Sequence, residues 1–280
     1  MRYAACAILG AALVMALGLA RTATSAETGA DSGDHPPVRE IVERASFMSY
    51  YQGKDGRAQV KMTIESPDGS ERIREFVMLR RDEANKGREN VDQKFYVYFH
   101  RPSDVREMVF MVWKHVAPGK DDDRWLYLPA LDLVKRIAAS DERTSFVGSH
   151  FFYEDVSGRN ITEDEHELVQ VTESYYVVES TPKNPELVEF SHYRNYIHKE
   201  TFIPVQTEYF DKNREKYREY KVLQVETIQG FKTVTKSRMK DLRSGGQTTI
   251  EYRNVSYNVG LPEGIFTERY LRKPPMQHLR

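Results

Sequence analysis

The stretch RWLYLPALDLVKRIAASDERTSFVGSHFFYEDVSG spans Arg124–Gly158. Trp125 to Leu128 form a short apolar run that predicts a strand, and Pro129 ends it because proline lacks the backbone donor that a sheet needs. The residues that follow mix apolar, aromatic and charged side chains without a helix or strand period. Irregular segments are normally polar and lie on the surface, so one this apolar is expected to cover something. The stretch therefore predicts a lid over an apolar cavity.

Candidate cavity residues are the large apolar side chains of this lid and of the strand before it. We expect the cavity and lid to be lined by Trp113, Trp125, Leu126, Leu128, Leu131, Leu133, Val134, Ile137, Phe146, Phe151, Phe152 and Tyr153. For the two tryptophans, packing inside the core remains an alternative. Lys135 and Arg136 are candidates to meet a phosphate or carboxylate at the cavity mouth, the alternative being solvated charges on the outer face of the lid.

Three phrases, in this order between Gly56 and Leu271, resemble one known family. They are WLYLPALDLVKRIAASDERTSFVGSHFFYEDVSGR, ETFIPVQTEYFD and GLPEGIFTERYL, and they resemble the outer-membrane lipoprotein-sorting (LolA-like) family of bacterial periplasmic proteins. The resemblance implies a mainly β fold, a strongly curved antiparallel sheet forming an open half-barrel, with helices and the lid over a hydrophobic concave face.

The same resemblance implies a non-enzymatic carrier. Its cargo would be the acyl chains of a lipid or lipoprotein, shuttled across the envelope with only transient membrane contact. An inner-membrane exporter of the resistance-nodulation-division type is the partner that the family suggests. This chain is longer than a minimal lipoprotein carrier, which leaves a different lipid open as the cargo.

The N-terminus has the layout of a secretory signal peptide. Arg2 precedes an apolar run from Ala4 to Ala20, and the small residues Thr24 to Ala26 follow. We expect cleavage after Ala26 and a periplasmic mature protein; an uncleaved membrane anchor is the alternative, because the run is nearly long enough to span a bilayer. Residues 27–37 read as a flexible linker, 38–272 as a single domain, and 273–280 as a frayed tail.

Composition excludes several classes of protein. The 41 basic and 42 acidic residues nearly balance, whereas a nucleic-acid-binding protein normally shows a basic patch or a high isoelectric point. Cys6 is the only cysteine and lies in the predicted signal peptide. Disulfides, cysteine-zinc sites and a cysteine nucleophile are therefore not expected in the mature protein.

Two hydrophobic periods organise the rest of the chain. Val38, Ile41, Val42, Ala45 and Met48 repeat at helical spacing after Pro36 and Pro37, which predicts an amphipathic helix. From Gly56 the period is two, with apolar residues alternating up to Ile64, and the turn residues 67–70 predict a hairpin with 71–81.

Later segments add further strands. Residues 95–99 and 108–113 are apolar on both faces, which predicts strands that are covered on both sides. Strands are also expected at 168–180, 187–199, 204–211, 217–228, 232–241 and 247–257. A sheet of about 10 to 12 strands has to curl rather than stay flat.

Catalytic and cofactor motifs are weak. His150 with Glu154, and the run 165–167, lack the ligand order of a metal site, and 121–123 lack that of a calcium loop. No GxSxG elbow, GxGxxG or P-loop pattern occurs, so we expect no catalytic residues, cofactor or metal. Two alternatives remain open: a hydrolase acting on an envelope lipid or glycan through Glu154 and Asp155, and an adaptor that docks through an exposed sheet edge.

Overall fold

The computed structural model describes residues 35–83 and 91–280. Residues 36–280 form one compact unit. The predicted signal peptide, its cleavage site and most of the predicted linker lie outside the described residues. Within the described part, no helix combines the length and the apolar character needed to cross a membrane.

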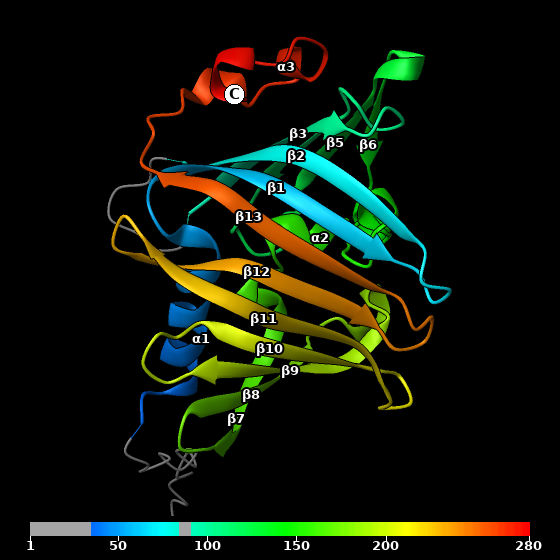
Figure 1. Cartoon of the computed structure of the whole chain (residues 1–280). Coiled ribbons are helices and arrows are strands. Elements are labelled where there is room, and N and C mark those ends of the chain that lie inside the picture. Colours follow the sequence, from blue (N-terminus) through cyan, green and yellow to red (C-terminus); the bar gives the residue numbers. More distant parts are fainter. Residues whose placement is uncertain (1–34, 84–90) are drawn as a thin grey trace, which may run out of the picture. The chain divides into compact units, whose positions relative to one another are not determined.

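One antiparallel sheet of 13 strands makes up most of this unit, in the order β6-β5-β4-β3-β2-β1-β13-β12-β11-β10-β9-β8-β7. The strands are β1 (Asp55–Glu65), β2 (Glu71–Asp82), β3 (Gln93–Arg101), β4 (Val109–Lys114), β5 (Asp123–Leu128), β6 (Leu133–Ile137), β7 (Asp164–Val171), β8 (Tyr175–Pro182), β9 (Phe190–His198), β10 (Pro204–Asp211), β11 (Lys216–Ile228), β12 (Phe231–Asp241) and β13 (Gln247–Tyr257). Two meanders, β1 to β6 and β7 to β13, join where β1 pairs with β13. The predicted curved, open antiparallel sheet is confirmed (Figure 1).

The concave face is the face that carries helices α1 (Val38–Ser46) and α2 (Tyr153–Ser157). Helix α1 has the predicted amphipathic pattern and buries Ile41, Val42 and Ala45 against β8 and β9. A π-helical turn, η1 (Phe47–Tyr51), continues it toward the sheet. The charged side chains of α1 pair along its opposite face, for example Arg39 with Glu43.

The strands of the first meander follow their sequence patterns. In β1 the alternating residues from Ala58 to Ile64 are buried on the concave face. β3 and β4 are buried on both faces, as their apolar runs predict. On the convex face their cover is the C-terminal segment 261–279, which includes helix α3 (Arg269–Arg272) and lies across this end of the sheet (Figure 1).

The C-terminal residues do not fray as expected. Leu279 is 1% exposed and packs with Leu271 and Phe266 against the convex face. Arg57 in β1 donates a hydrogen bond to the backbone oxygen of the terminal Arg280. The expectation failed because the sequence from Lys273 to Arg280 is short and mostly polar, and its one large buried apolar residue, Leu279, makes no recognisable period.

The expected lid is part hairpin and part irregular segment. Residues 123–137 form the β5–β6 hairpin at one edge of the sheet. Residues 138–158 contain only short helical turns and α2 between irregular stretches, and they turn back under the concave face, where they bury Phe146 and Tyr153. With the loop that leads to β7, they form the irregular segment 138–164. The strand expected over 168–180 is two strands, since a turn at 172–174 separates β7 from β8. These two hairpins account for a strand number above the expected range.

Candidate functional site

A cavity of about 390 Å³ lies between the concave face, the α1–η1 helix and the irregular segment 138–164. We call it the concave cavity. Three kinds of lining residue bear on its function, and uncharged polar side chains such as Ser49, Asn195 and Thr207 complete the lining. The aliphatic and phenyl side chains include Ala58, Phe76, Met78, Phe95, Met239 and Ile250; the tyrosines are Tyr50, Tyr193, Tyr209, Tyr220, Tyr252 and Tyr257; the acidic and basic residues are Arg57, Arg80, Glu154, Asp155 and Arg159.

The apolar wall is anchored by a cluster of aromatic rings. Phe146 is 2% exposed and its ring centroid lies 5.5 Å from that of Phe110 and 5.9 Å from that of Phe99. Tyr153 meets the same ring edge to face at 5.5 Å. Aromatic pairs in this geometry add stability beyond their buried area. The irregular segment is therefore fixed to the sheet through Phe146 beside the cavity.

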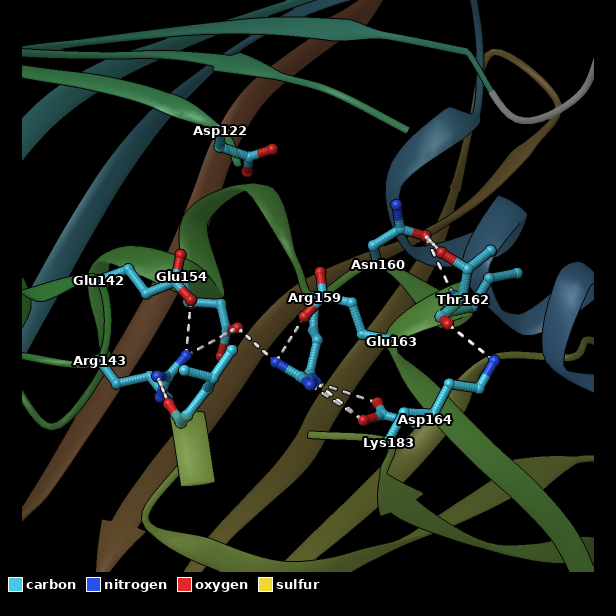
Figure 2. A network of polar contacts seen from close by, with 12 residues as sticks. Asp122, Glu142, Arg143, Glu154, Arg159, Asn160, Thr162, Glu163, Asp164 and Lys183 are labelled. Atoms are coloured by element: carbon cyan, nitrogen blue, oxygen red, sulfur yellow. Dashed lines mark hydrogen bonds and ion pairs between the residues drawn. The ribbon is translucent and has the colours of Figure 1, made fainter. Parts of the chain in front are cut away.

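An ion network, drawn in Figure 2, lies beside the cavity, and two of its members, Glu154 and Arg159, line it. It consists of Glu142, Arg143, Glu154, Arg159, Glu163 and Asp164. At its centre, the Arg159 guanidinium lies 3.0 Å from Asp164, 2.7 Å from Glu163 and 3.2 Å from Glu154. Figure 2 shows Arg143 approaching Glu154 from the other side, at 3.5 Å. Three carboxylates thus share the Arg159 guanidinium, and Glu154 also has Arg143 as a partner.

A buried lysine holds the end of α2. Lys114 Nζ donates to the carbonyl oxygens of Ser157 at 2.7 Å and Gly158 at 3.0 Å. Burial lowers the pKa of Lys114 to about 8, with Asp122 the largest opposing influence. Gly158 has φ of 76°, and a Cβ added there would overlap the ring of Tyr50. Glycine is required at this position because η1 packs directly on it.

A residue of the sheet holds Asp155 in place. Arg218 of β11 forms an ion pair with it, and the Phe152 backbone N–H donates to its Oδ2 at 2.6 Å. The same guanidinium lies 3.8 Å above the Phe152 ring. Glu154 and Asp155, the acid pair of the hydrolase alternative, are therefore both engaged by arginines, which favours a structural role for them.

Burial raises the pKa of Glu154 to about 7; Glu142 adds to the rise, while Arg159 and Arg143 oppose it. The ordinary value is 4.5. Between these two values the folded protein keeps a proton that the unfolded chain has lost. The free energy of unfolding therefore falls as the pH rises from about 4.5 to about 7.

We expect Glu154→Gln to remove this fall. The free energy of unfolding of the variant, relative to that of wild type, should rise by about 2 kcal/mol between pH 5 and pH 8, because one pKa unit corresponds to about 1.4 kcal/mol. Urea unfolding followed by circular dichroism at pH 5, 6, 7 and 8 measures the difference. Glu165→Gln, at a side chain that is 78% exposed, is the control and should show no such trend. A constant difference for Glu154→Gln would contradict the assignment.

The fold places the chain among known proteins. A family model described as an uncharacterized protein matches residues 91–273. A DUF1329 family protein from Desulfovibrio piger has 28% identity and a TM-score of 0.76, over 85% of this chain and 100% of that chain. The chain belongs to the family that this model describes, and its fold is LolA-like.

Two further structures are similar to this LolA-like protein in fold. An outer membrane lipoprotein-sorting protein domain from Vibrio parahaemolyticus has 22% identity and a TM-score of 0.74, over 84% of this chain and 97% of that chain. A LolA superfamily protein from Nitrosomonas europaea has 19% identity and a TM-score of 0.64, over 84% of this chain and 100% of that chain. No curated protein matches the sequence.

Of the predicted cavity residues, Phe146 and Phe151 line the concave cavity. Leu126, Leu128, Ile137 and Tyr153 belong to the surrounding core cluster without lining it, and Phe152 packs under Arg218. Trp113, Trp125 and Val134 lie on the convex face with the C-terminal segment. Leu131 and Leu133 are 71% and 45% exposed at the β5–β6 turn.

The predicted head-group residues also lie outside the cavity lining. Lys135 and Arg136 are exposed on β6, and Arg136 pairs with Asp123. Contact of any of these residues with a cargo stays a prediction. Their positions show that the β5–β6 hairpin does not reach the concave cavity.

Sequence reasoning missed the tyrosine wall and the helix side of the cavity. Tyr193, Tyr209, Tyr220 and Tyr252 come from four different strands, and Tyr50 from η1. The high number of tyrosines, 17 in the sequence, was a usable signal. It indicates no site by itself, because strand pairing alone brings these positions together.

The residues weighed as metal ligands are engaged elsewhere. His150 Nδ1 lies 2.8 Å from Thr248 Oγ1, and His166 bonds to Ser180 and to the Ile161 carbonyl. Among residues 35–83 and 91–280, no cluster of three or more histidine, aspartate or glutamate side chains has the geometry to hold a metal ion.

Proposed function

We propose that this LolA-like protein is a periplasmic carrier that sequesters the hydrocarbon chain of a lipid or lipoprotein in the concave cavity, reversibly and without a covalent step. The observation that supports the proposal is a partly open volume of about 390 Å³ left unfilled by side chains, beside an apolar wall. Natural protein interiors are close-packed, with few voids larger than a water molecule. A hollow of this size is therefore typical of a ligand site.

The size of the cavity sets its capacity. A cavity of about 150 Å³ accommodates one benzene molecule. By that scale about 390 Å³ accommodates roughly sixteen carbon atoms, which is one long hydrocarbon chain rather than two. A lipid with several chains would leave the others outside, or would need the irregular segment to move.

The energetics suit a carrier. Each buried methylene stabilises a bound chain by about 0.8 kcal/mol, so a chain of about 16 carbons represents on the order of 12 kcal/mol removed from water. A bilayer offers a similar gain, and binding much tighter than a bilayer would prevent release. In this proposal the segment 138–158 moves to admit and release the cargo, which requires it to give up the ring contacts of Phe146 and the ion pair of Asp155 with Arg218.

The remaining parts of the proposal come from the family resemblance. Residues 1–26 would direct export and be cleaved, 27–37 would act as a linker, and 38–272 would form the lipid-binding domain. An inner-membrane exporter of the resistance-nodulation-division type would supply or accept the cargo. An assay for delivery between exporter-containing vesicles and acceptor vesicles would address that step separately.

Titration with the uncharged fluorescent probe N-phenyl-1-naphthylamine tests cargo binding. Its size is close to the capacity estimated above. We expect a rise in fluorescence that saturates at one probe per protein, because the described residues of the concave face form one hollow with room for about one probe. A signal that rises linearly without saturation, or no signal, would count against a preformed apolar site.

A further inference from the structure

The lining of the concave cavity has a chemical bias that a site for plain hydrocarbon would not need. The phenol hydroxyls fall into two groups. Tyr193 donates to Asp164 at 2.7 Å, Tyr220 bonds to Ser237, and Tyr257 lies 2.9 Å from Thr233 Oγ1. Among the described residues, the hydroxyls of Tyr50, Tyr209 and Tyr252 form no hydrogen bond.

These three hydroxyls reach the open volume. The described side-chain atoms that are sealed from solvent without a partner include no tyrosine oxygen, and all three residues line the cavity. Tyr50 interacts electrostatically with Tyr209, Tyr220 and Tyr252, and all four residues line the cavity. A polar group facing an enclosed space without a partner costs free energy unless a ligand or water completes it.

The charged lining residues, in contrast, are already paired. Arg80 donates to Asp82 at 3.0 Å and to the backbone oxygens of Gln52 and Gly53 at 2.8 and 2.6 Å. The other four also have partners within the protein: Arg57 with the Arg280 backbone oxygen, Asp155 with Arg218, and Glu154 and Arg159 within the ion network. Each charged side chain among the described lining residues thus has a partner within the protein, and only the partner of Arg57 is a backbone oxygen rather than an opposite charge.

Burial reinforces the neutral character of the phenols. It raises the pKa of Tyr50, Tyr209 and Tyr252 above the ordinary value of 10. Each phenol therefore stays protonated and can both donate and accept one hydrogen bond. An anionic or cationic head group would lose its hydration here without gaining a counter-charge, which is costly in an enclosed site.

We propose that the cargo is an uncharged amphiphile, a single hydrocarbon body that bears hydroxyl or carbonyl oxygens, and that Tyr50, Tyr209 and Tyr252 bind those oxygens. The inference rests on the proposed carrier function and specifies its ligand class. The apolar wall, made by side chains such as Ala58, Phe76 and Phe95, binds the hydrocarbon, while the three tyrosines bind the polar end.

Competition against bound N-phenyl-1-naphthylamine tests the ligand class with three ligands that share one 16-carbon chain. They are 1-hexadecanol, palmitate at pH 8 and hexadecyltrimethylammonium, each used below its aggregation limit. We expect 1-hexadecanol to displace the probe at a concentration at least about tenfold lower than either ion, because only the ions lose hydration without compensation. Equal or better competition by palmitate or by the cation would overturn the proposal.

Single substitutions test the residues. Tyr50→Phe, Tyr209→Phe and Tyr252→Phe keep the ring and remove the hydroxyl. Each should weaken competition by 1-hexadecanol by about two- to tenfold, the usual contribution of one neutral hydrogen bond, once the competition is corrected for that variant's own measured probe affinity. Tyr196→Phe is the matched control, since its hydroxyl bonds to Glu208 and it does not line the cavity.

The outcomes separate the two proposals. If the probe binds but the three phenylalanine variants compete like wild type, the tyrosine assignment is wrong and the carrier function stands. If the probe does not bind to wild type, both are wrong.

Discussion

Arg159→Met is expected to lower the free energy of unfolding by about 3–5 kcal/mol, the usual cost of removing one partner from a buried ion pair. Arg159 is the cation at the centre of the ion network, and the Asp164 side chain beside it is 0% exposed. Without the guanidinium, Asp164, Glu163 and Glu154 would face one another across a poorly solvated space (Figure 2). Urea unfolding at pH 7.5, followed by circular dichroism, measures the loss.

A matched arginine separates this effect from loss of an arbitrary surface charge. Arg39 pairs with Glu43 on α1, and its side chain is 87% exposed. Exposed pairs contribute little, so Arg39→Met should leave the unfolding midpoint unchanged. If Arg159→Met were as stable as Arg39→Met, the carboxylates of the network would not need their cation, and the network would not hold segment 138–164 in place.

Local hydrophobic periodicity was sufficient to predict a helix or strand where one face of the element is buried. The helix over Val38 to Met48 and the alternating strand from Ala58 to Ile64 were predictable because each carries its burial pattern in consecutive residues. The double-sided burial of β3 and β4 was also predictable. What covers their convex face was not, because the C-terminal segment comes from more than 150 residues away.

Apolar character alone misplaced part of the site. Leu131 and Leu133 lie at a hairpin turn, where they are largely exposed. The run around them has no period that distinguishes an exposed turn from a lid. In the same stretch, Phe146 and Phe151 do face the cavity. Their side chains face the cavity because the chain reverses after Ala138, and no local sequence pattern predicts that reversal.

The tyrosines that line the cavity could be predicted only with knowledge of the strand order. Tyr209, Tyr220 and Tyr252 belong to three separate strands, and they share a face only because β10 to β13 are neighbours in the sheet. The ion network does not depend on the strand order, because its members all lie between residues 142 and 164. They come together only because the segment folds back on itself and places Arg143 beside Glu154.

Ala58→Trp should abolish cargo binding while the sheet remains folded. Ala58 lies on the concave face of β1, is 9% exposed and lines the cavity. An indole there would occupy space that the cargo needs. Exclusion of only four methylenes would cost roughly 3 kcal/mol, so affinity for N-phenyl-1-naphthylamine should fall by roughly a hundredfold or more.

Thr63→Trp is the matched control for this variant. It lies on the same strand and does not line the cavity. Probe affinity in this variant should stay within about twofold of wild type, because tryptophan is well tolerated on strand surfaces. A comparable loss in both variants would point to damage of the sheet rather than to a blocked cavity.

Native mass spectrometry of wild type and Ala58→Trp, purified in parallel from membrane-containing cells, tests the central claim most directly. The account predicts a wild-type peak that carries one non-covalent lipid, and a variant that carries none. Wild-type protein free of lipid, or the same adduct on both proteins, would contradict the claim that the concave cavity holds the cargo.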